Sequence, residues 1–341
     1  MKLNAIKRLL IIAICVPMVL TGCNKSETKV ENTTQAPATV VTEETKDEFK
    51  IGIAQLVEHP ALDASRQGFI DELKNLGVNV VIDEKSAQGD IANAQIIAEK
   101  FVKDNVDLIF SIATLTSQAA KKAIEGTDVP LVFTAVTDPV FSQLVTDMNV
   151  TDNNITGVID AAPIKEDLNL FKELKQDAKT IGIIYNTGES NSEVQVNQTK
   201  EIAKELGLTI ETSGITTVND IPQAVDTLSK KVDGLYIITD NMVASSISLV
   251  AKLAEEKGLI TVSADGTHVD EGIMMSKGIS FYDIGKQSAV IAKMILVDKV
   301  DIKDIPVQTA PDFDKRVNTR VMEVFGFKKD NKAFEGAEFV E

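Results

Sequence analysis

From residue 50 to about residue 300 the chain alternates between two kinds of segment, and this alternation constrains the fold most. Short Val- and Ile-rich runs are separated by longer stretches whose apolar residues recur at three- and four-residue steps, as at Phe69, Leu73 and Leu76. Runs that are apolar on both faces indicate strands covered by helices on both sides. Strand-helix-strand repetition over this length predicts parallel sheets with right-handed crossovers.

The alternation also appears twice along the chain. IGIAQLVEHP opens one series and IGIIYNTGES opens another, and each leads through a polar loop into an amphipathic helix. We therefore expect an α/β fold of two Rossmann-like, doubly wound lobes, with one large sheet as the alternative. Strands are expected at 51–54, 78–83, 108–111, 131–134, 180–185, 209–212, 234–238, 260–263 and 274–278. Helices are expected near 61–76, 91–104, 116–125, 164–175, 191–206, 220–230, 243–257 and 283–297.

The N-terminus has the anatomy of a secretory signal. Lys2, Lys7 and Arg8 precede an apolar run from residue 9 to residue 20, which is shorter than the ~20 residues that a spanning helix requires. The following Leu-Thr-Gly-Cys ends at Cys23 and resembles a bacterial lipobox, whose cysteine becomes the lipidated first residue of the mature protein. We expect removal of residues 1–22 and a lipid anchor on Cys23. An ordinary signal peptide with an incidental cysteine is the alternative.

Residues 24–48 are polar and rich in Thr and Glu, without a sustained apolar period. Such a segment cannot bury enough apolar surface to offset its conformational entropy, so we expect a disordered tether from Cys23 to residue 48. The remaining residues, about 290, suffice for two domains of ordinary size.

Composition excludes several classes of function. The net charge of −16 becomes −19 without the three basic residues of the signal, and a chain this acidic repels nucleic acid. Its two cysteines are Cys15, inside the signal, and Cys23, so the folded part has no thiol for a disulfide, a zinc site or a nucleophile. His59 and His268 are the only histidines, which excludes a His-rich metal site. No Gly-rich phosphate motif follows a strand, so we expect no cofactor and no metal.

Ligands of open parallel sheets bind beyond the carboxyl ends of the strands, where this chain has hydroxyls, amides and a few carboxylates without a Lys or Arg cluster. These groups match a neutral or zwitterionic small ligand. The candidates in the first series are Gln55, Glu58, Ser111, Thr114, Thr137 and Asp138. The candidates in the second series are Asn186, Ser190, Asn191, Thr239, Asp240, Asn241 and Asp265.

Roles can be assigned to some of these candidates. Free helical N–H groups near Thr114 can hold a carboxylate, and Asp240 or Asp265 can accept hydrogen bonds from an ammonium group. For either aspartate, capping of a helix N-terminus is the alternative. His59 is most simply a solvated loop residue that also has the option of contacting ligand, and Asp138 before Pro139 predicts a turn. Several aromatic residues can stack on an aromatic ligand or belong to the core: Tyr185, Tyr236, Phe281 and Tyr282.

Seven segments follow one another in a familiar order. They are IGIAQLVEHPALDASRQGFIDEL, AQGD, SIATLTSQAA, VFTAVTDPV, IGIIYNTGESNS, TDNMV and VSADGTHVDEG. Together they resemble the solute-binding lipoproteins of ABC importers of the tryptophan/tyrosine type, over essentially all of residues 50–300. The resemblance implies a periplasmic-binding-protein type I fold, whose two lobes are joined by three crossovers and enclose the ligand. It implies a first lobe of 49–157 plus 279–308 and a second of 158–278 plus 309–341.

The resemblance also implies a function. We expect a monomeric, lipid-anchored protein on the outer face of a bacterial membrane that binds an amino acid, with tyrosine or tryptophan favoured. An ABC permease and an ATPase are the implied partners, and Gln55, Thr114, Thr137, Asp138, Asp240, Asn241 and Asp265 match the cleft positions of the family. An enzyme is not expected, because the two isolated histidines leave little material for a catalytic triad. A surface adhesin or signalling receptor of the same fold is the alternative, alone or as a second role.

Overall fold

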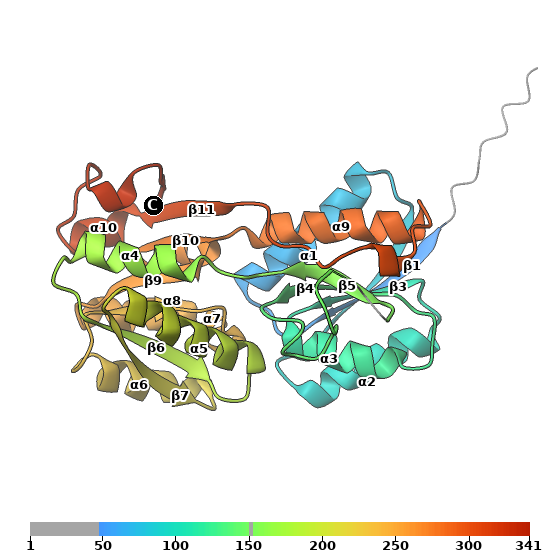
Figure 1. Cartoon of the computed structure of the whole chain (residues 1–341), viewed down its shortest axis with the longest axis horizontal. Helices are drawn as coiled ribbons and strands as arrows, with labels where there is room; N and C mark the ends of the chain where they lie inside the picture. The colour runs from blue at the N-terminus through green and yellow to red at the C-terminus, as the bar shows by residue number, and fades with distance from the viewer. Residues whose placement is uncertain (1–47, 150–152) are drawn as a thin grey trace, which may run out of the picture. The chain divides into compact units, whose positions relative to one another are not determined.

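The computed structural model describes residues 48–149 and 153–341 (Figure 1). The predicted signal peptide, Cys23 and the tether up to residue 47 lie outside the described residues. Two separate sheets are present, so the single-sheet alternative is wrong. No helix within the described ranges combines the length and the apolar character that crossing a bilayer demands.

The first sheet is entirely parallel, with strand order β2-β1-β3-β4-β5. Apolar layers pack on both of its faces, and Phe69 stacks on Phe110 with ring centroids 3.8 Å apart. This burial explains the apolar runs without alternation. Its strands are β1 (Phe49–Gln55), β2 (Val80–Ser86), β3 (Leu108–Ile112), β4 (Leu131–Val136) and β5 (Ile155–Ile159). Its helices are α1 (Pro60–Asn75), α2 (Ile91–Lys103) and α3 (Thr114–Ile124).

The second sheet has the order β12-β11-β10-β9-β8-β6-β7 and is parallel except where β10 meets β11. Its strands are β6 (Thr180–Asn186), β7 (Thr209–Ile215), β8 (Gly234–Ile237), β9 (Ile260–Asp265), β10 (Met275–Ile279), β11 (Phe313–Asn318) and β12 (Glu338–Val340). Its α-helices are α4 (Ile164–Leu174), α5 (Ser190–Glu205), α6 (Ile221–Leu228), α7 (Asn241–Ala244), α8 (Ile247–Glu256) and α10 (Thr319–Val324). Short 3₁₀ turns are η1 (Val218–Asp220), η2 (Gly266–Val269), η3 (Ile302–Asp304) and η4 (Lys332–Phe334).

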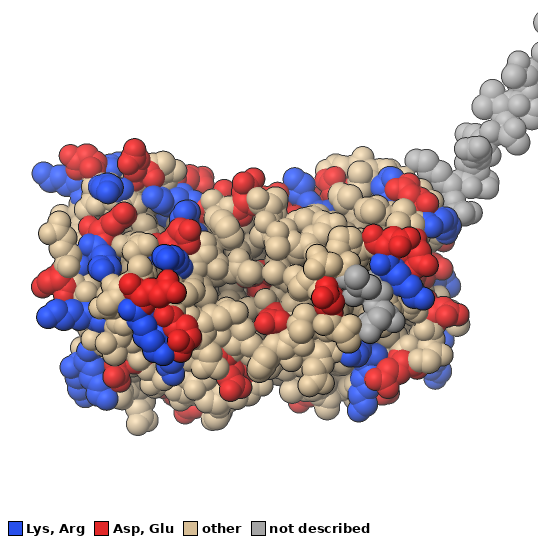
Figure 2. Space-filling view, viewed as in Figure 1, with Lys and Arg blue, Asp and Glu red and all other residues tan. Residues whose placement is uncertain are grey.

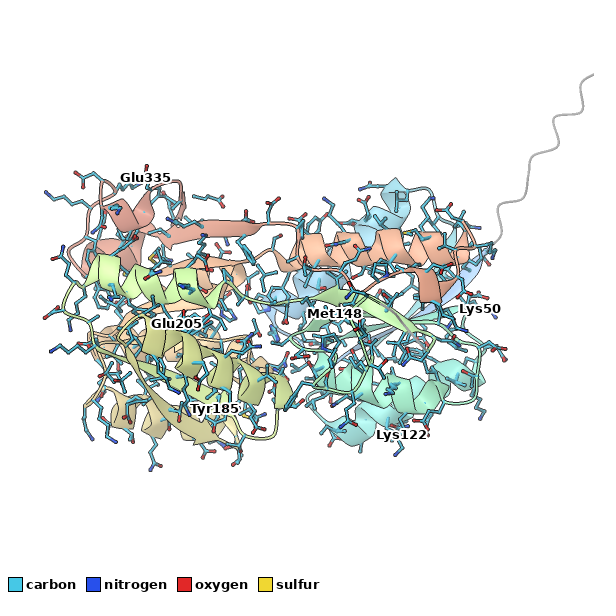
Figure 3. The ribbon with its side chains drawn as sticks, viewed as in Figure 1. Lys50, Lys122, Met148, Tyr185, Glu205 and Glu335 are labelled. Atoms are coloured by element: carbon cyan, nitrogen blue, oxygen red, sulfur yellow. The ribbon has the colours of Figure 1, made fainter. Side chains whose placement is uncertain are left out.

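The chain passes between the two sheets three times: after β5, after β10 and before β11 (Figure 1). After the second passage, α9 (Phe281–Leu296) packs lengthwise on α1. Two glycines allow this approach, because a Cβ atom at Gly68 would lie 2.0 Å from the Tyr282 carbonyl oxygen, and one at Gly285 would lie 2.0 Å from that of Ser65. We call the first sheet with α1–α3 and α9 the first lobe, and the second sheet with its helices the second lobe. In Figure 3, Lys50 and Lys122 mark the first lobe, and Tyr185, Glu205 and Glu335 mark the second.

The sequence prediction of elements has four omissions and one error. The strands β5, β11 and β12 and the helix α10 were not predicted: β5 reads ITGVI, with Thr and Gly among its apolar residues, and β11 reads FDKRVN, a charged sequence with four of its six residues only partly buried or exposed. The single helix predicted over 243–257 is wrong. It is two helices, α7 and α8, because Ser246 leaves the helical region with φ −127° and ψ 24°.

Candidate functional site

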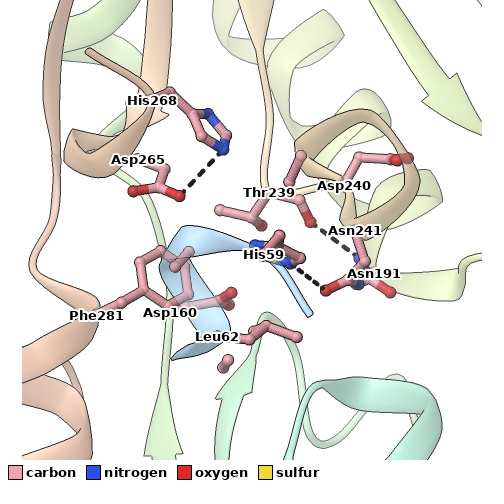
Figure 4. Close-up of a pocket in the computed structure, with 13 residues that line it drawn as sticks. His59, Leu62, Asp160, Asn191, Thr239, Asp240, Asn241, Asp265, His268 and Phe281 are labelled. Carbon is pink, nitrogen blue, oxygen red and sulfur yellow. Dashed lines mark hydrogen bonds and ion pairs between the residues drawn. The ribbon is translucent and has the colours of Figure 1, made fainter. Parts of the chain in front are cut away.

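An interlobe cavity of about 10 Å³ lies where the carboxyl ends of the strands of both sheets face each other (Figure 4). In this arrangement of the lobes it has room for about one water molecule. The first lobe and the passages between lobes line it with His59, Ala61, Leu62, Ala135, Asp160 and Phe281. The second lobe lines it with Asn191, Thr239, Asp240, Asn241, Ala244, Asp265 and His268.

Two side-chain contacts join the lobes beside this cavity. His59 Nε2 lies 3.4 Å from Asn241 Oδ1, and the hydroxyl oxygens of Thr137 and Thr239 lie 3.5 Å apart. Both contacts pair a residue that follows a first-lobe strand with one that follows β8. The structure therefore shows the lobes in a closed arrangement.

Glu189 organises the wall of the second lobe. It precedes α5, yet its buried carboxylate turns to α7 and accepts the backbone N–H groups of Asn241 (3.1 Å) and Met242 (3.2 Å). The same two oxygens accept side-chain amide hydrogens from Asn186 (3.0 Å), Asn191 (3.3 Å) and Asn241 (2.5 Å). Five donors on one carboxylate fix the orientation of three asparagines. The sequence did not single out Glu189 as a site residue.

Asp240 completes this wall. Its Oδ1 accepts the N–H of Val243 at 2.8 Å, and its Oδ2 accepts from the Asn186 N–H at 2.6 Å and the Ser192 hydroxyl at 2.7 Å. Asp240 therefore caps α7, which was the alternative interpretation, and its contact with a ligand stays a prediction. Burial, with the neighbouring charge of Glu189, raises the pKa of Asp240 to about 7. Glu189 and Asp240 together occupy the first three N–H groups of α7, which leaves none of these free to bind an anion.

Asp265 and His268 form a buried pair on η2. Asp265 Oδ1 caps η2 by accepting from the N–H (2.8 Å) and hydroxyl (2.9 Å) of Thr267, so its capping role is also confirmed. Asp265 Oδ2 lies 3.2 Å from His268 Nε2, at ion-pair distance but without hydrogen-bond alignment. Burial lowers the pKa of His268, which favours a neutral imidazole. Asp265 Oδ2 thus has no aligned hydrogen-bond donor in His268 and can accept a hydrogen bond from a ligand cation.

Asp160 is a cavity residue that the sequence did not predict. It follows β5 at the first passage between lobes and is 3 % exposed. Burial raises its pKa to about 6, against the opposing effect of the Thr137 hydroxyl. Its Oδ1 has no hydrogen-bond partner among residues 48–149 and 153–341. Asp160 is therefore a lining carboxylate with unused capacity to accept a hydrogen bond.

His59 also differs from its sequence interpretation. The prediction of a solvated loop residue is wrong, because the ring is 6 % exposed and lines the interlobe cavity. Burial comes in part from the second lobe, which supplies Asn241. Contact with a partner so distant in sequence is not visible in local residue patterns.

The remaining first-lobe candidates lie outside the lining of the interlobe cavity. Gln55 is buried, donates to Asp63 Oδ1 at 2.7 Å and accepts from Arg66 at 3.1 Å, whereas Glu58 is exposed. The Ser111 hydroxyl pairs with that of Ser117 at 2.7 Å. Their contact with a ligand stays a prediction.

Three further candidates lie near the ends of first-lobe strands. Thr114 is buried at the first position of α3, and its hydroxyl has no partner within the described ranges. Thr137 is buried and reaches Thr239 across the lobes. Asp138 Oδ1 accepts from the N–H groups of Val140 (3.0 Å) and Phe141 (2.9 Å), which confirms the predicted turn. A ligand role for Thr114, Thr137 and Asp138 stays a prediction.

A second, side cavity of about 240 Å³ shares Asn241 with the first. Asn186 lines this side cavity, whereas the buried Ser190 hydroxyl lines neither and has no partner within the described ranges. The lining residues are Leu56, Val57, Gln88, Gly89, Leu115, Asn186, Glu189, Val218, Asn241, Met242 and Ser245. Neither lining includes Lys or Arg, and on the face in Figure 2 the basic side chains gather toward the two ends.

Two parallel-sheet lobes that close over a polar cavity define a solute-binding protein of the periplasmic-binding-protein type I fold. The family model "ABC transporter substrate binding protein" matches residues 50–337, and the chain belongs to this family. It is a solute-binding protein of an ABC transporter and not an enzyme. ABC substrate-binding proteins face the extracellular or periplasmic side of the membrane.

Named relatives refine this assignment. The chain is 35% identical over 332 residues to the tyrosine-binding protein of Clostridioides difficile (strain R20291), covering 96% of this chain and 94% of that protein. Among solved structures, an ABC domain from Streptococcus pneumonia in complex with L-Trp has a TM-score of 0.81 at 29% identity, covering 86% of this chain and 100% of that chain.

A third relative is more similar to this chain in sequence than in the arrangement of its structure. The ligand-free, open structure of a substrate binding protein with adhesive properties from Clostridium difficile is 40% identical, covering 86% of this chain and 99% of that chain. Its TM-score is nevertheless only 0.67. The lower similarity to the open structure agrees with the closed arrangement that the contacts between the lobes indicate here.

Proposed function

We propose that this protein captures an amino acid outside the cell, with tyrosine or tryptophan favoured, and delivers it to an ABC importer. The observation that carries this proposal is the meeting of three buried carboxyl groups, Asp160, Asp240 and Asp265, around a cavity that no Lys or Arg of the described residues lines. Buried carboxyl groups without a basic partner suit a ligand that brings an ammonium group. The named tyrosine and tryptophan relatives support the choice of side chain.

The three aspartates differ in their free capacity for the ammonium group. Asp240 accepts three hydrogen bonds from its own lobe, and Asp265 has one oxygen occupied by Thr267. Asp160 has an oxygen without any partner within the described ranges. We therefore add Asp160 to the two aspartates predicted from the sequence, and place the ammonium group closest to Asp160 and Asp265.

The α-carboxylate requires N–H donors, and the first lobe supplies them. The helix α1 begins without a side-chain cap from His59, and its first-turn residues Ala61 and Leu62 line the interlobe cavity. The helix α3, which begins at Thr114, also lacks a side-chain cap. Free N–H groups at the start of a helix bind anions without an arginine. Leu62, Phe281 and the lining alanines then remain for the ligand's side chain.

Binding is coupled to closure in this proposal. The ammonium and carboxylate contacts draw on both lobes, so a ligand gains its full set of interactions only in the closed form. Such a ligand shifts the equilibrium between open and closed forms toward the closed form. The closed form, displayed by both lobes, is what a permease with its ATPase would recognise.

The proposal includes a place on the membrane and a domain division. We propose that residues 1–22 are removed, that Cys23 carries lipid and that the protein acts as a monomer. We keep the division into 49–157 plus 279–308 and 158–278 plus 309–341. Mass spectrometry of the membrane-bound protein tests the lipid, and Cys23→Ser should release the protein into the medium or periplasm.

Titration calorimetry with each amino acid tests the ligand. We expect tight binding of tyrosine, tryptophan or both, and weak or undetectable binding of sugars and branched-chain amino acids. Tight binding of a sugar or a branched-chain amino acid, with neither aromatic ligand binding, would refute the proposal.

Adhesion is a second candidate role, favoured by the adhesive properties of the 40% identical Clostridium difficile substrate binding protein. Attachment of purified protein to host cells should then survive Asp240→Ala, which damages the cavity but leaves the outer faces intact. Loss of attachment together with loss of ligand binding would contradict an independent adhesive surface.

A further inference from the structure

One ring nitrogen of His59 has a hydrogen-bond partner in the protein, and the other has none within the described ranges. Its Nε2 contacts Asn241 Oδ1 of the other lobe at 3.4 Å. Its Nδ1 is buried and has no partner within the described ranges, and the ring does not cap α1. Buried polar atoms in folded proteins are generally hydrogen-bonded, so an orphan on the wall of a ligand cavity calls for a ligand group.

The position of the hydrogen on His59 follows from the neighbouring amide. Glu189 accepts from the Asn241 side-chain nitrogen and from the Asn241 backbone N–H. The opposite orientation of the Asn241 amide would place its oxygen against the Glu189 carboxylate. Asn241 therefore presents its oxygen to His59, and His59 Nε2 must be the donor.

The charge state of His59 determines what Nδ1 can do. Burial lowers the pKa of His59, with smaller opposing effects of Asp265 and Asp63, which favours a neutral ring. Asp160, Asp240, Asp265 and His268 are the titratable groups that line the same cavity. A neutral imidazole with its hydrogen on Nε2 has a lone pair on Nδ1 and is an acceptor there.

We propose that His59 Nδ1 binds the ligand by accepting a hydrogen bond from it, in the closed form that Glu189 and Asn241 organise. This inference rests on the proposed function and assigns one ligand contact of that site to His59. The donor is an O–H or N–H group, either the phenol or indole of the side chain or the ammonium. Because Asn241 belongs to the second lobe, opening of the cleft removes the contact that fixes this acceptor.

Two substitutions separate the nitrogen atoms of His59. His59→Gln keeps an amide that can donate to Asn241 but has no acceptor at the Nδ1 position. His59→Asn keeps an acceptor near the Nδ1 position but is too short to reach Asn241. Calorimetry compares each variant with the wild type for three ligands: the aromatic amino acid that binds, phenylalanine, and the corresponding 3-arylpropionate that lacks the ammonium group.

We expect His59→Gln to weaken binding of the preferred amino acid about tenfold, a loss typical of one hydrogen bond in a dry site, and His59→Asn to weaken it less. The loss should disappear for the ligand that lacks the relevant donor. If His59→Gln binds phenylalanine as tightly as the wild type does, the donor is the phenol or indole of the side chain. If His59→Gln binds the arylpropionate as tightly as the wild type does, the donor is the ammonium group. An equal loss for all three ligands overturns the inference. Wild-type protein that binds no aromatic amino acid refutes the proposed function itself.

Histidine ¹⁵N NMR gives a readout that a purely structural role would not move. The protein has two histidines, and His59→Gln assigns their signals by difference. We expect His59 to carry its hydrogen on Nε2 in the ligand-bound protein. When ligand is added, the ¹⁵N chemical shift of Nδ1 should change to that of a nitrogen that accepts a hydrogen bond. Glu189→Gln releases the Asn241 amide and should mix the tautomers. An Nδ1–H tautomer in the bound wild type contradicts the proposal.

Discussion

The two walls of the interlobe cavity are built differently. The wall of the second lobe is internally bonded: Glu189 accepts five hydrogen bonds and Asp240 accepts three, all from donors of the same lobe. On the opposite side, His59 Nδ1 and Asp160 Oδ1 have no partners within the described ranges, and alanines and Leu62 fill much of the remainder. Asn191 Oδ1 and His268 Nε2 of the second lobe also lack hydrogen-bond partners within the described ranges. The carboxylates Glu189 and Asp240 of the second lobe are thus preorganised, whereas unused bonding capacity for a ligand is present on both walls.

The largest effect should come from Glu189→Gln. An amide cannot accept five hydrogen bonds in place of a carboxylate, and each donor left unpaired in the buried wall costs ~1–3 kcal/mol. We expect amino-acid affinity to fall about 100-fold and the free energy of unfolding to fall by about 3 kcal/mol. Glu193→Gln, an exposed change in the first turn of α5, the helix that Glu189 precedes, should alter neither quantity. Calorimetry and urea unfolding measure the two effects, and wild-type affinity in Glu189→Gln would show that the wall is not organised by this residue.

Asp160→Asn tests the role of the unpaired Asp160 carboxyl group through the pH dependence of stability. The pKa of Asp160 is raised from 3.8 to about 6, so the native state holds a proton in this interval that the unfolded state has lost. The stability of the ligand-free protein should therefore fall as pH rises from 3.8 to about 6, by about 3 kcal/mol in all, and the penalty should persist above that interval.

Asp160→Asn should remove this part of the pH dependence, raise stability at neutral pH and weaken ligand binding. Denaturant unfolding at several pH values, with the exposed Asp177→Asn as control, measures the difference. A variant that keeps the wild-type pH dependence, or that binds ligand as well as the wild type, would contradict a functional role for this buried carboxylate.

Gly68→Ala tests whether the packing of α1 on α9 stabilises the first lobe. This packing matters because the first-lobe wall of the interlobe cavity has few hydrogen bonds of its own. The added Cβ atom would lie 2.0 Å from the Tyr282 carbonyl oxygen and force α1 away from α9. We expect a loss of about 2 kcal/mol in unfolding free energy, with the exposed Gln67→Ala on the same helix as control. Unchanged thermal stability would show that the two helices do not support the first lobe.

Asp240→Ala should weaken amino-acid binding at least tenfold, equivalent to about 1.4 kcal/mol. The change removes a carboxylate from the cavity wall and also releases the N–H groups of Val243 and Asn186 that it holds. Asp240→Asn, which keeps the volume and one acceptor oxygen, should lose less. Calorimetry that finds both variants equal to the wild type would remove Asp240 from the site.

The sequence predicted the second-lobe wall better than the first, and the reason is physical. Asn191, Thr239, Asp240, Asn241 and Asp265 stand directly after recognisable strands or open the following helix, and all five line the interlobe cavity. Their positions follow from local patterns, because parallel strands end at a common edge. Their grouping into one polar site could therefore be predicted from the sequence, without their coordinates.

The other half of the site was not predictable in this way. Asp160 follows β5, which reads ITGVI and has Thr and Gly among its apolar residues, so no continuous apolar run marks it. The burial of His59 depends on a residue of the other lobe, and Glu189 acts on α7 rather than on the helix that it precedes. Each of these roles arises from contact between segments distant in sequence, which periodicity and spacing do not encode.

The packing of α9 on α1 has a consequence for the order of biosynthesis. Every strand of the first sheet leaves the ribosome well before α9, with strands β6 to β10 of the second sheet made in between. Until α9 has been synthesised, the side of α1 that carries Gly68 has no helix to pack against. The first lobe therefore stays incomplete while most of the second lobe is being translated.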